Sequence, residues 1–346
     1  MIVTILIAIV FFSLIIFVHE LGHFLTARLF KVKVHEFAVG MGPKLLSWGK
    51  GETKYSIRAI PVGGFCSMEG EDSESSDEGS LSAKPWYARF IILASGAAMN
   101  ILLGFVICVV FVCIYYSSGI PTTTVEGVVT QAPAAEFIQP GDRIIRVNGH
   151  RTNILKDINF EVQNNSAETM EITLQRDGET ITRKVKPYLE QYEDGSTRYL
   201  VGFTAEFEKP NVFNVLRQSF YETVWNGKIV FVSLGMLISG KAGVNEVSGP
   251  VGVVNVMSEA AKPGGLAGLV NILSIAALIS VNIGIMNLLP FPALDGGRIF
   301  FVFIEAIRRK PIPPEKEGIV HFIGLVLLLG LMVFATWNDI MKLISG

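Results

Sequence analysis

The sequence lacks an excess of charge of either sign. Its 346 residues carry 29 lysines and arginines against 31 aspartates and glutamates, a formal net charge of −2. Without a basic surplus it has nothing to neutralise the phosphates of a nucleic acid, so we expect no such partner. Cysteine is scarce too. Its three residues include Cys108 and Cys113 in one apolar stretch, which argues against a disulfide framework and favours small packing side chains.

Charged residues of all kinds are few. They make up 17% of the chain, against 50% apolar residues, where a soluble domain has about 25% charged residues. This composition is typical of a polytopic α-helical membrane protein in a lipid bilayer. A helix crosses a bilayer with about 20 residues, and we expect four such helices, at residues 1–29, 89–117, 266–307 and 319–344.

The positive charges between the spans predict the orientation. No lysine or arginine precedes the first apolar run and no small-residue cleavage site ends it, so we interpret it as a retained helix and not as a signal peptide. Arg28, Lys31 and Lys33 follow it, and a second basic cluster lies at residues 308–316. Cytoplasmic loops carry such clusters, which predicts a cytoplasmic segment 30–88 and both termini outside.

Two histidines and a glutamate interrupt the first span, as His19-Glu20-Leu21-Gly22-His23. An ionisable group inside a membrane helix costs about 2.5–3.5 kcal/mol and is by default functional. The spacing places His19 and His23 one turn apart on one helix face, with Glu20 beside them. Two imidazoles in this arrangement suit a divalent metal, and the glutamate suits a general base.

Asp295 is the candidate for a third ligand. Prolines and glycines at residues 290–297 must break the third helix, and broken backbone at membrane depth lines a cavity. The predicted orientation brings Asp295 to the depth of His19 and His23, forming a site with one position open for water. Zinc would lower the pKa of that water to about 7, and Glu20 would pass its proton to the leaving amine. The alternative is a helix-capping aspartate, or one paired with Arg298.

The segment 30–88 contains candidate strands. Residues 35–43 read as a strand and turn, and residues 55–62 alternate as a strand that Pro61 confines to an edge. An edge strand beside a membrane can pair with an extended partner chain, which makes Tyr55, Ile57 and Ala59 candidate substrate contacts. The alternative is a small structural hairpin. Residues 69–80 are rich in serine and acidic residues and predict a flexible linker.

The composition of residues 121–207 is that of a soluble α+β domain. Gly141-Asp142-x-Ile144-x-x-Val147-Asn148-Gly149 and the order of strands around it resemble a PDZ domain, which would lie on the extracytoplasmic side and bind a peptide or protein at its sheet edge. Residues 208–265 follow as an amphipathic segment that we expect at the membrane interface.

The combined motifs resemble the site-2 protease family, in its bacterial RseP-like form with a single PDZ domain. They are the HExxH of the first span, the PDZ domain, and Asn287-x-Leu-Pro-x-Pro-x-Leu-Asp295-Gly-Gly. The resemblance implies an intramembrane zinc endopeptidase of the cell membrane that cleaves transmembrane segments of single-span proteins, such as anti-sigma factors or remnant signal peptides. It implies His19, His23 and Asp295 as Zn²⁺ ligands and Glu20 as the catalytic base.

The resemblance also assigns further roles. Gly96-x-x-x-Asn100 matches the family's second span, which implies that Asn100 lies near the substrate, as does Asn287; alternatively, Asn100 bonds one helix to another. Residues 55–65 would form the family's membrane-associated hairpin.

Two alternative functions, each from another class of protein, remain. One is a non-catalytic PDZ scaffold, and the other is a metal transporter that uses His19, His23 and Asp295 as a transit site. Neither explains why Glu20 adjoins the first histidine. His35, His150 and His321 have no partner spacing, and we expect surface or interfacial roles for them.

Overall fold

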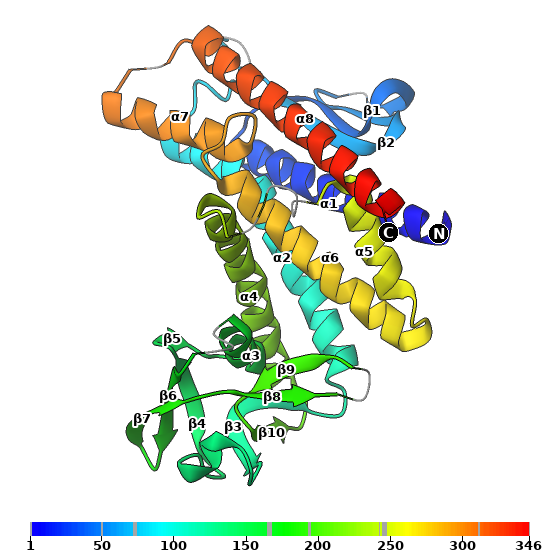
Figure 1. The fold of residues 1–346 in the computed structure, drawn as a ribbon. Coiled ribbons are helices and arrows are strands. Elements are labelled where there is room, and N and C mark those ends of the chain that lie inside the picture. The colour runs from blue at the N-terminus through cyan, green and yellow to red at the C-terminus, as the bar shows by residue number, and fades with distance from the viewer. Residues whose placement is uncertain are drawn as a thin grey trace. The chain divides into compact units, whose positions relative to one another are not determined.

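The computed structural model of the chain describes residues 2–49, 51–71, 75–164, 168–192, 195–241, 243, 248–310 and 312–345. The chain divides into two compact units (Figure 1). Unit 1 consists of Met1–Ile107 together with Asn226–Gly346, and unit 2 of Cys108–Trp225.

Four helices of the described chain are long and apolar enough to cross a membrane. These stretches are Leu6–Leu29, Trp86–Tyr115, Gly265–Leu288 and Glu315–Ile344. They belong to α1 (Ile2–Leu29), α2 (Trp86–Tyr115), α6 (Gly265–Leu288) and α8 (Pro314–Ser345). The expected number of spans is therefore found.

The third expected span, 266–307, is not one helix. α6 ends at Leu288, and α7 (Asp295–Arg308) begins after six residues of irregular backbone. Pro290 and Pro292 lie in this interval, and a proline supplies no backbone N–H to continue a helix. The break makes Asp295 the first residue of a new helix.

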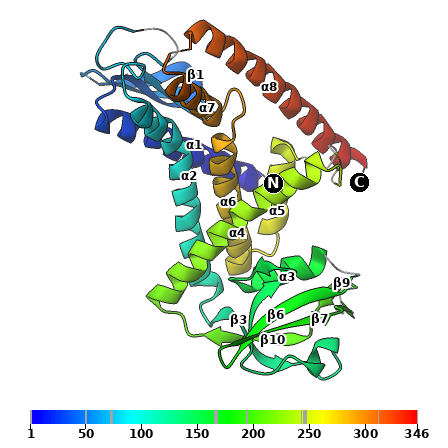
Figure 2. The same ribbon diagram turned by 90° about the vertical axis from the view of Figure 1, so that its left-hand side faces the viewer.

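Small residues let α1, α2 and α6 approach one another closely (Figures 1 and 2). A Cβ atom on Gly22 of α1 would lie 2.5 Å from the carbonyl oxygen of Ser95 in α2, and one on Gly284 of α6 would lie 2.8 Å from that of Ala97. Thr26 and Ser95 add a hydroxyl hydrogen bond of 2.8 Å between α1 and α2. The helix packing therefore depends on residues without bulk, as in other membrane bundles.

The predicted hairpin follows α1. β1 (Val34–Trp48) pairs antiparallel with β2 (Lys54–Met68). β1 passes through Gly40 and Gly42 with φ angles of +86° and +81°, where a residue with a side chain is disfavoured. The turn expected within residues 35–43 is thus a bend inside one long strand.

This bend determines which residues of β2 have backbone groups left unpaired by a neighbouring strand. Tyr55 is paired with Trp48 and also with Phe37, and Ile57 is paired with Leu46 and also with Val39. Both therefore have a strand on each side, so the prediction of an open edge at Tyr55 and Ile57 is wrong. Ala59 lies between Arg58 and Ile60, whose register partners are Lys44 and Met41. The alternation of residues 55–62 could reveal a strand but not its neighbours.

The segment that follows β2 is packed in its described part. The N–H of Glu69 donates to the carbonyl of Lys33 at 2.9 Å, and the Lys33 ammonium pairs with Asp77 at 2.5 Å. Ser80 and Leu81 are buried. The prediction of a flexible linker is therefore wrong for these residues; residues 72–74 lie outside the described chain.

Unit 2 contains the expected α+β domain. One sheet has the order β10-β3-β4-β6-β7, with β5 paired to β4, and a separate pair consists of β8 and β9. The bounds are β3 Ile120–Val128, β4 Arg143–Val147, β5 His150–Arg151, β6 Met170–Arg176, β7 Glu179–Val185, β8 Tyr188–Gln191, β9 Thr197–Leu200 and β10 Phe203–Glu208, with α3 at Leu155–Asn164 and a 3₁₀ turn at Pro133–Glu136. Ile144, Ile158 and Leu174 are among the residues of its buried core. The strands of this part of the chain extend from residue 120 to residue 208; the domain bounds 121–207 stay a prediction.

The expected amphipathic segment, 208–265, forms two helices, α4 (Val212–Ile238) and α5 (Pro250–Ala261). Asn214, Gln218 and Glu222 of α4 are buried at four-residue spacing, and Glu222 pairs with Lys156 of α3 at 2.6 Å. Phe213 and Phe220 are 77% and 56% exposed. The polar face of α4 therefore faces protein and its apolar face is left outside; its position at a membrane interface stays a prediction.

None of the three cysteines, all of which lie in the described chain, forms a disulfide. Cys66 and Cys108 are buried, as expected of small packing residues, whereas Cys113 is exposed. The packing interpretation is therefore wrong for Cys113.

Candidate metal centre

Two helices of unit 1 bring the three predicted ligands together. His19 and His23 project from consecutive turns of α1, and Asp295 is the first residue of α7. Asp295 Oδ2 lies 3.1 Å from Nε2 of His19 and 3.3 Å from Nε2 of His23, and the two Nε2 atoms are 3.3 Å apart. One ligand atom from each of the three residues lies within 4.8 Å of the other two.

The donor set fits a zinc ion. His23 Nδ1 is 2.9 Å from the carbonyl oxygen of Ile92; a carbonyl only accepts, so the ring proton is on Nδ1 and the Nε2 lone pair points to the cluster. Asp295 Oδ2 is buried there without a well-aligned hydrogen bond. Lone pairs of two imidazoles and a carboxylate that converge in a buried space are stabilised by a cation, and His₂-carboxylate is a zinc donor set.

Asn100 contacts the other ring nitrogen of His19. Its amide nitrogen lies 3.3 Å from His19 Nδ1, while its Oδ1 is buried without a partner. Exchanging the nitrogen and oxygen of the Asn100 amide would let Oδ1 accept a hydrogen bond from the Nδ1–H of His19, so that these two atoms would each have a partner. Asn100 is 0% exposed, so its side chain lies behind His19. Its predicted contact with the substrate stays untested.

Gly96 provides the clearance that the histidines need. A Cβ atom at this position would lie 2.4 Å from His23 Nε2 and 2.8 Å from His19 Cε1, closer than any real Cβ contact. Every other residue would push an imidazole out of the cluster. The spacing Gly96-x-x-x-Asn100 thus puts an empty position and an amide one turn apart on the face of α2 that meets the two histidines.

Glu20 lies on the same turn of α1 and is half-buried. A Cβ on Gly64 of β2 would be 3.4 Å from Glu20 Cγ, and the Ser13 hydroxyl of α1 donates to the carbonyl of Pro61. The segment 61–65 of β2 therefore runs along α1 past the candidate base.

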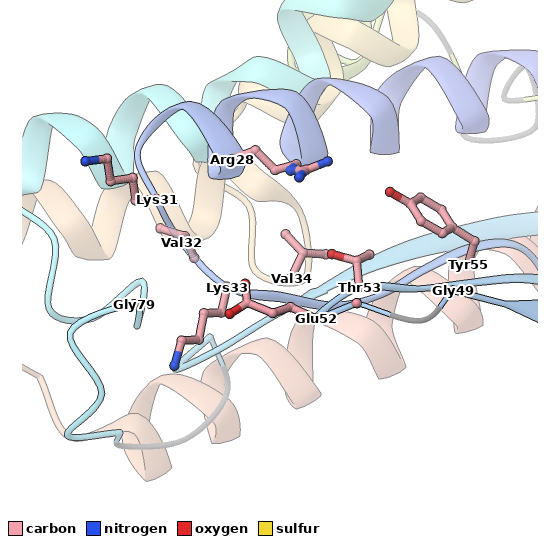
Figure 3. A pocket seen from close by; sticks show the side chains of 11 residues that line it. Arg28, Lys31, Val32, Lys33, Val34, Gly49, Glu52, Thr53, Tyr55 and Gly79 are labelled. Atoms are coloured by element: carbon pink, nitrogen blue, oxygen red, sulfur yellow. The ribbon is translucent and has the colours of Figure 1, made fainter.

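Other predicted substrate contacts lie elsewhere. Tyr55 lines a hollow of about 610 Å³ below the end of α1, with Arg28 on the opposite wall (Figure 3). None of His19, His23 and Asp295 lines this hollow. Asn287 is half-buried in the last turn of α6, and its contact with a substrate stays a prediction.

Sequence reasoning missed two partners of the Asp295 region. Arg298 pairs with Glu71, a residue of the segment expected to be a linker; a pairing of Asp295 with Arg298 stays an untested alternative. His321 of α8 accepts a hydrogen bond from the N–H of Ala293 at 2.9 Å. Neither partner has a sequence spacing that could reveal it, because each contact joins a helix to a loop 28 or 227 residues away in the sequence.

An HExxH motif on one helix, completed by the Asp295 carboxylate from another, defines a class of metal-dependent peptidases. Residues 7–331 match peptidase family M50, and the chain belongs to this family, the site-2 proteases, as its motifs predicted. It is 32% identical over 424 aligned positions to the regulator of sigma-W protease RasP of Bacillus subtilis, with 98% of this chain and 99% of the relative covered. The zinc metalloprotease RasP of Geobacillus kaustophilus is 31% identical, with 96% and 97% covered. A protein of Clostridium acetobutylicum named as a zinc metalloprotease is 38% identical over 338 residues, 97% of each chain.

Among solved structures, the PDZ domain of an SdrC-like protein from Listeria innocua is similar, at 16% identity and a TM-score of 0.23. The match covers 25% of this chain and 96% of that domain. The corresponding Listeria monocytogenes domain gives 17% identity and a TM-score of 0.20, with 28% and 92% covered.

Proposed function

We propose that this chain is a zinc endopeptidase that cleaves peptide bonds within the membrane. The observation that carries the proposal is the convergence of Asp295 with His19 and His23, which lie with Glu20 on a helix apolar enough to cross a bilayer. Soluble substrates do not require such a location, whereas transmembrane segments do.

His19, His23 and Asp295 would hold the ion, which when bound supplies a Lewis acid that polarises the scissile carbonyl and acidifies water. Glu20 accepts the proton of the attacking water and delivers it to the leaving amine. The Ile92 carbonyl and the Asn100 amide orient the imidazoles, since the second ring nitrogen of each histidine bonds to one of them.

The substrate proposed is the membrane helix of a single-span protein, such as an anti-sigma factor or a remnant signal peptide. A helix hides its carbonyls in hydrogen bonds, so it must unwind before water can attack. Within the described chain, residues 64 and 65 of β2 pair only with Val39 and Ala38, and Gly64 lies beside Glu20. Their second side could hydrogen-bond an unwound substrate. This position replaces the expected contacts at Tyr55, Ile57 and Ala59.

The domain at residues 120–208 is proposed to be a PDZ domain outside the cytoplasm that binds a peptide or protein ligand. The proposal is supported by Gly141-Asp142 and Asn148-Gly149 in turns around β4, and by the basic residues at 28–33 and 308–316, which favour the cytoplasmic side for the opposite ends of the spans. A bacterial cell membrane fits the organisms of the relatives named above.

The decisive experiment compares the wild type with Glu20→Gln. Each purified protein is incubated with a single-span substrate, with and without a zinc chelator. We expect the wild type to cleave only without chelator, and Glu20→Gln to bind zinc yet cleave about 100-fold or more slowly. Glu126→Gln, an exposed glutamate of unit 2, is the control.

Equal cleavage by wild type and Glu20→Gln, or by neither, contradicts the proposal. In liposomes, metal flux without any cleavage product would favour the transporter, and neither flux nor cleavage would favour the scaffold.

A further inference from the structure

The loop before Asp295 contains a strained residue. Ala293 has a φ angle of +75°, a region that costs an L-residue with a side chain about 1 kcal/mol or more. Such a conformation persists only where the surroundings hold it. Because Ala293 is two residues before Asp295, its backbone angles decide where α7 starts and hence where the carboxylate points.

His321 of α8 holds this residue. Its Nδ1 accepts the hydrogen bond from Ala293 N–H at 2.9 Å, so its own proton is on Nε2, which lies 3.6 Å from Glu317 Oε1. The ring is mostly buried and packs against Phe301, with ring centres 5.7 Å apart. A Cβ on Gly297 of α7 would come 3.2 Å from His321 Cε1. The imidazole is therefore wedged between the loop and the first turns of α7.

Gly324, one turn further along α8, lies against the same loop. A Cβ atom on Gly324 would lie 2.4 Å from Pro292 Cβ and 2.6 Å from its carbonyl oxygen. His321 and Gly324 are three residues apart and share one helix face. This face therefore offers a hydrogen-bond acceptor and an adjacent empty position, which together fit the chain at residues 292 and 293.

We propose that His321 and Gly324 form a seat on α8 that positions Asp295 as the third metal ligand. The inference rests on the proposed zinc function. His321 is not a ligand in this scheme, although it is a histidine near a metal centre. It is a positioning residue that acts through the backbone of Ala293. The surface or interfacial role expected for His321 from the sequence is replaced by this one.

The test measures zinc affinity of the purified full-length protein by competition with graded chelator. His321→Ala removes the acceptor, and we expect an affinity loss of about tenfold, the size of effect known for residues that orient metal ligands. His321→Asn keeps an acceptor near the position of Nδ1, and we expect at least a threefold recovery relative to alanine. Phe322→Ala, the exposed neighbour on α8, is the matched control and leaves the affinity unchanged.

A second variant tests the strain itself. Glycine adopts positive φ without cost, so Ala293→Gly no longer needs the hydrogen bond to hold the loop. We expect Ala293→Gly to restore most of the zinc affinity when added to His321→Ala, and to change little in the wild type. Gly324→Val should lower the affinity as His321→Ala does, because its side chain would displace Pro292.

The outcomes separate this inference from the proposed function. If the wild type holds zinc and His321→Ala holds it equally well, the seat is refuted while the protease proposal stands. If asparagine is as damaging as alanine, or Ala293→Gly restores nothing, the hydrogen bond is not what positions Asp295. If the wild type itself holds no zinc, the proposed function fails and the inference with it.

Discussion

Gly96 of α2 lies against the imidazole of His23, so close that a Cβ atom would be 2.4 Å from Nε2. The contact joins the second helix to the HExxH turn at the atom that faces Asp295. It leads to the first prediction. Gly96→Ala should lower zinc affinity at least 100-fold by displacing the ring, while the helices still form because alanine is the better helix former. Zinc retained under chelator competition is the measurement.

Gly330→Ala is the control for this substitution. Gly330 also lies within a long apolar helix, α8, and a Cβ there meets nothing within 4 Å. The zinc affinity and cleavage rate of the Gly330→Ala protein should equal those of the wild type. An unimpaired Gly96→Ala would mean that the histidines do not occupy the positions described.

Asn100 gives a second prediction. Aspartate retains an oxygen to accept the Nδ1 proton of His19, whereas leucine removes it at similar volume. We expect Asn100→Asp to bind zinc within about threefold of the wild type and Asn100→Leu to bind about 10–100-fold more weakly. If both variants bind zinc normally but cleave poorly, Asn100 acts on the substrate, as the sequence resemblance implied.

The third prediction concerns pH and unit 2. Burial alone would raise the pKa of Asp142, but two hydrogen bonds from Arg176, at 2.7 and 2.8 Å, and one from the Gln139 N–H outweigh it and lower that pKa below its usual value. Since the folded pKa is below the unfolded one, the stabilisation is present above about pH 4 and is lost as the pH falls through the folded value.

Scanning calorimetry of the full-length protein from pH 6 to pH 3 should therefore show the transition of unit 2 moving to lower temperature. Asp142→Asn should remove this pH dependence and cost about 2 kcal/mol at pH 6. Asp177→Asn is a suitable control, because asparagine tolerates the φ of +50° found in that turn. An unchanged pH dependence in Asp142→Asn would rule out this pair as its source.

The fourth prediction concerns the Lys156–Glu222 pair that joins α3 to α4. Glu222 is 2% exposed, and the ammonium also lies 5.4 Å from the Phe111 ring and 5.2 Å from the Trp225 ring. Glu222→Ala leaves Lys156 without its carboxylate, and we expect unit 2 to lose about 2–3 kcal/mol of stability. In the double variant Lys156→Met with Glu222→Leu both charges of the pair are removed together, and most of this loss of stability should be recovered.

The exposed pair of Glu259 and Lys262 provides the comparison for denaturation experiments. Their side chains are 55% and 68% exposed, and Glu259→Ala should change the stability by less than about 0.5 kcal/mol. A Glu222→Ala protein as stable as Glu259→Ala would show that α4 is held to unit 2 by its other contacts.

The sequence predicted those parts of the centre that follow from local geometry. His19, Glu20 and His23 share a helical turn, so their spacing alone defines their arrangement. Asp295 could be predicted because the basic residues that follow the first and third spans indicated that both spans run in the same direction, which gave Asp295 the same expected membrane depth as the two histidines. Asn100 was identified through the resemblance of Gly96-x-x-x-Asn100 to the family's second span, but its contact with His19 depends on how α2 is rotated against α1, which no local pattern encodes.

The hairpin and His321 show where such reasoning ends. Alternation identified a strand at residues 55–62, yet its neighbours depend on the bend at Gly40 and Gly42, which folds β1 back on β2. The importance of His321 depends on a backbone N–H of Ala293, and a backbone group leaves no signature in the residue type. Both features arise from long-range contacts between segments whose local patterns are ordinary.

The seat on α8, if it positions Asp295 as proposed, also decides at which stage of synthesis the metal centre is complete. Residues 321 and 324 are translated after all three metal ligands, so a nascent chain that stops short of them carries every ligand but has no support for Ala293. Partly synthesised molecules would therefore bind zinc more weakly than the complete chain, by about the tenfold expected of His321→Ala. The full zinc affinity would be reached only once α8 packs on the loop before Asp295.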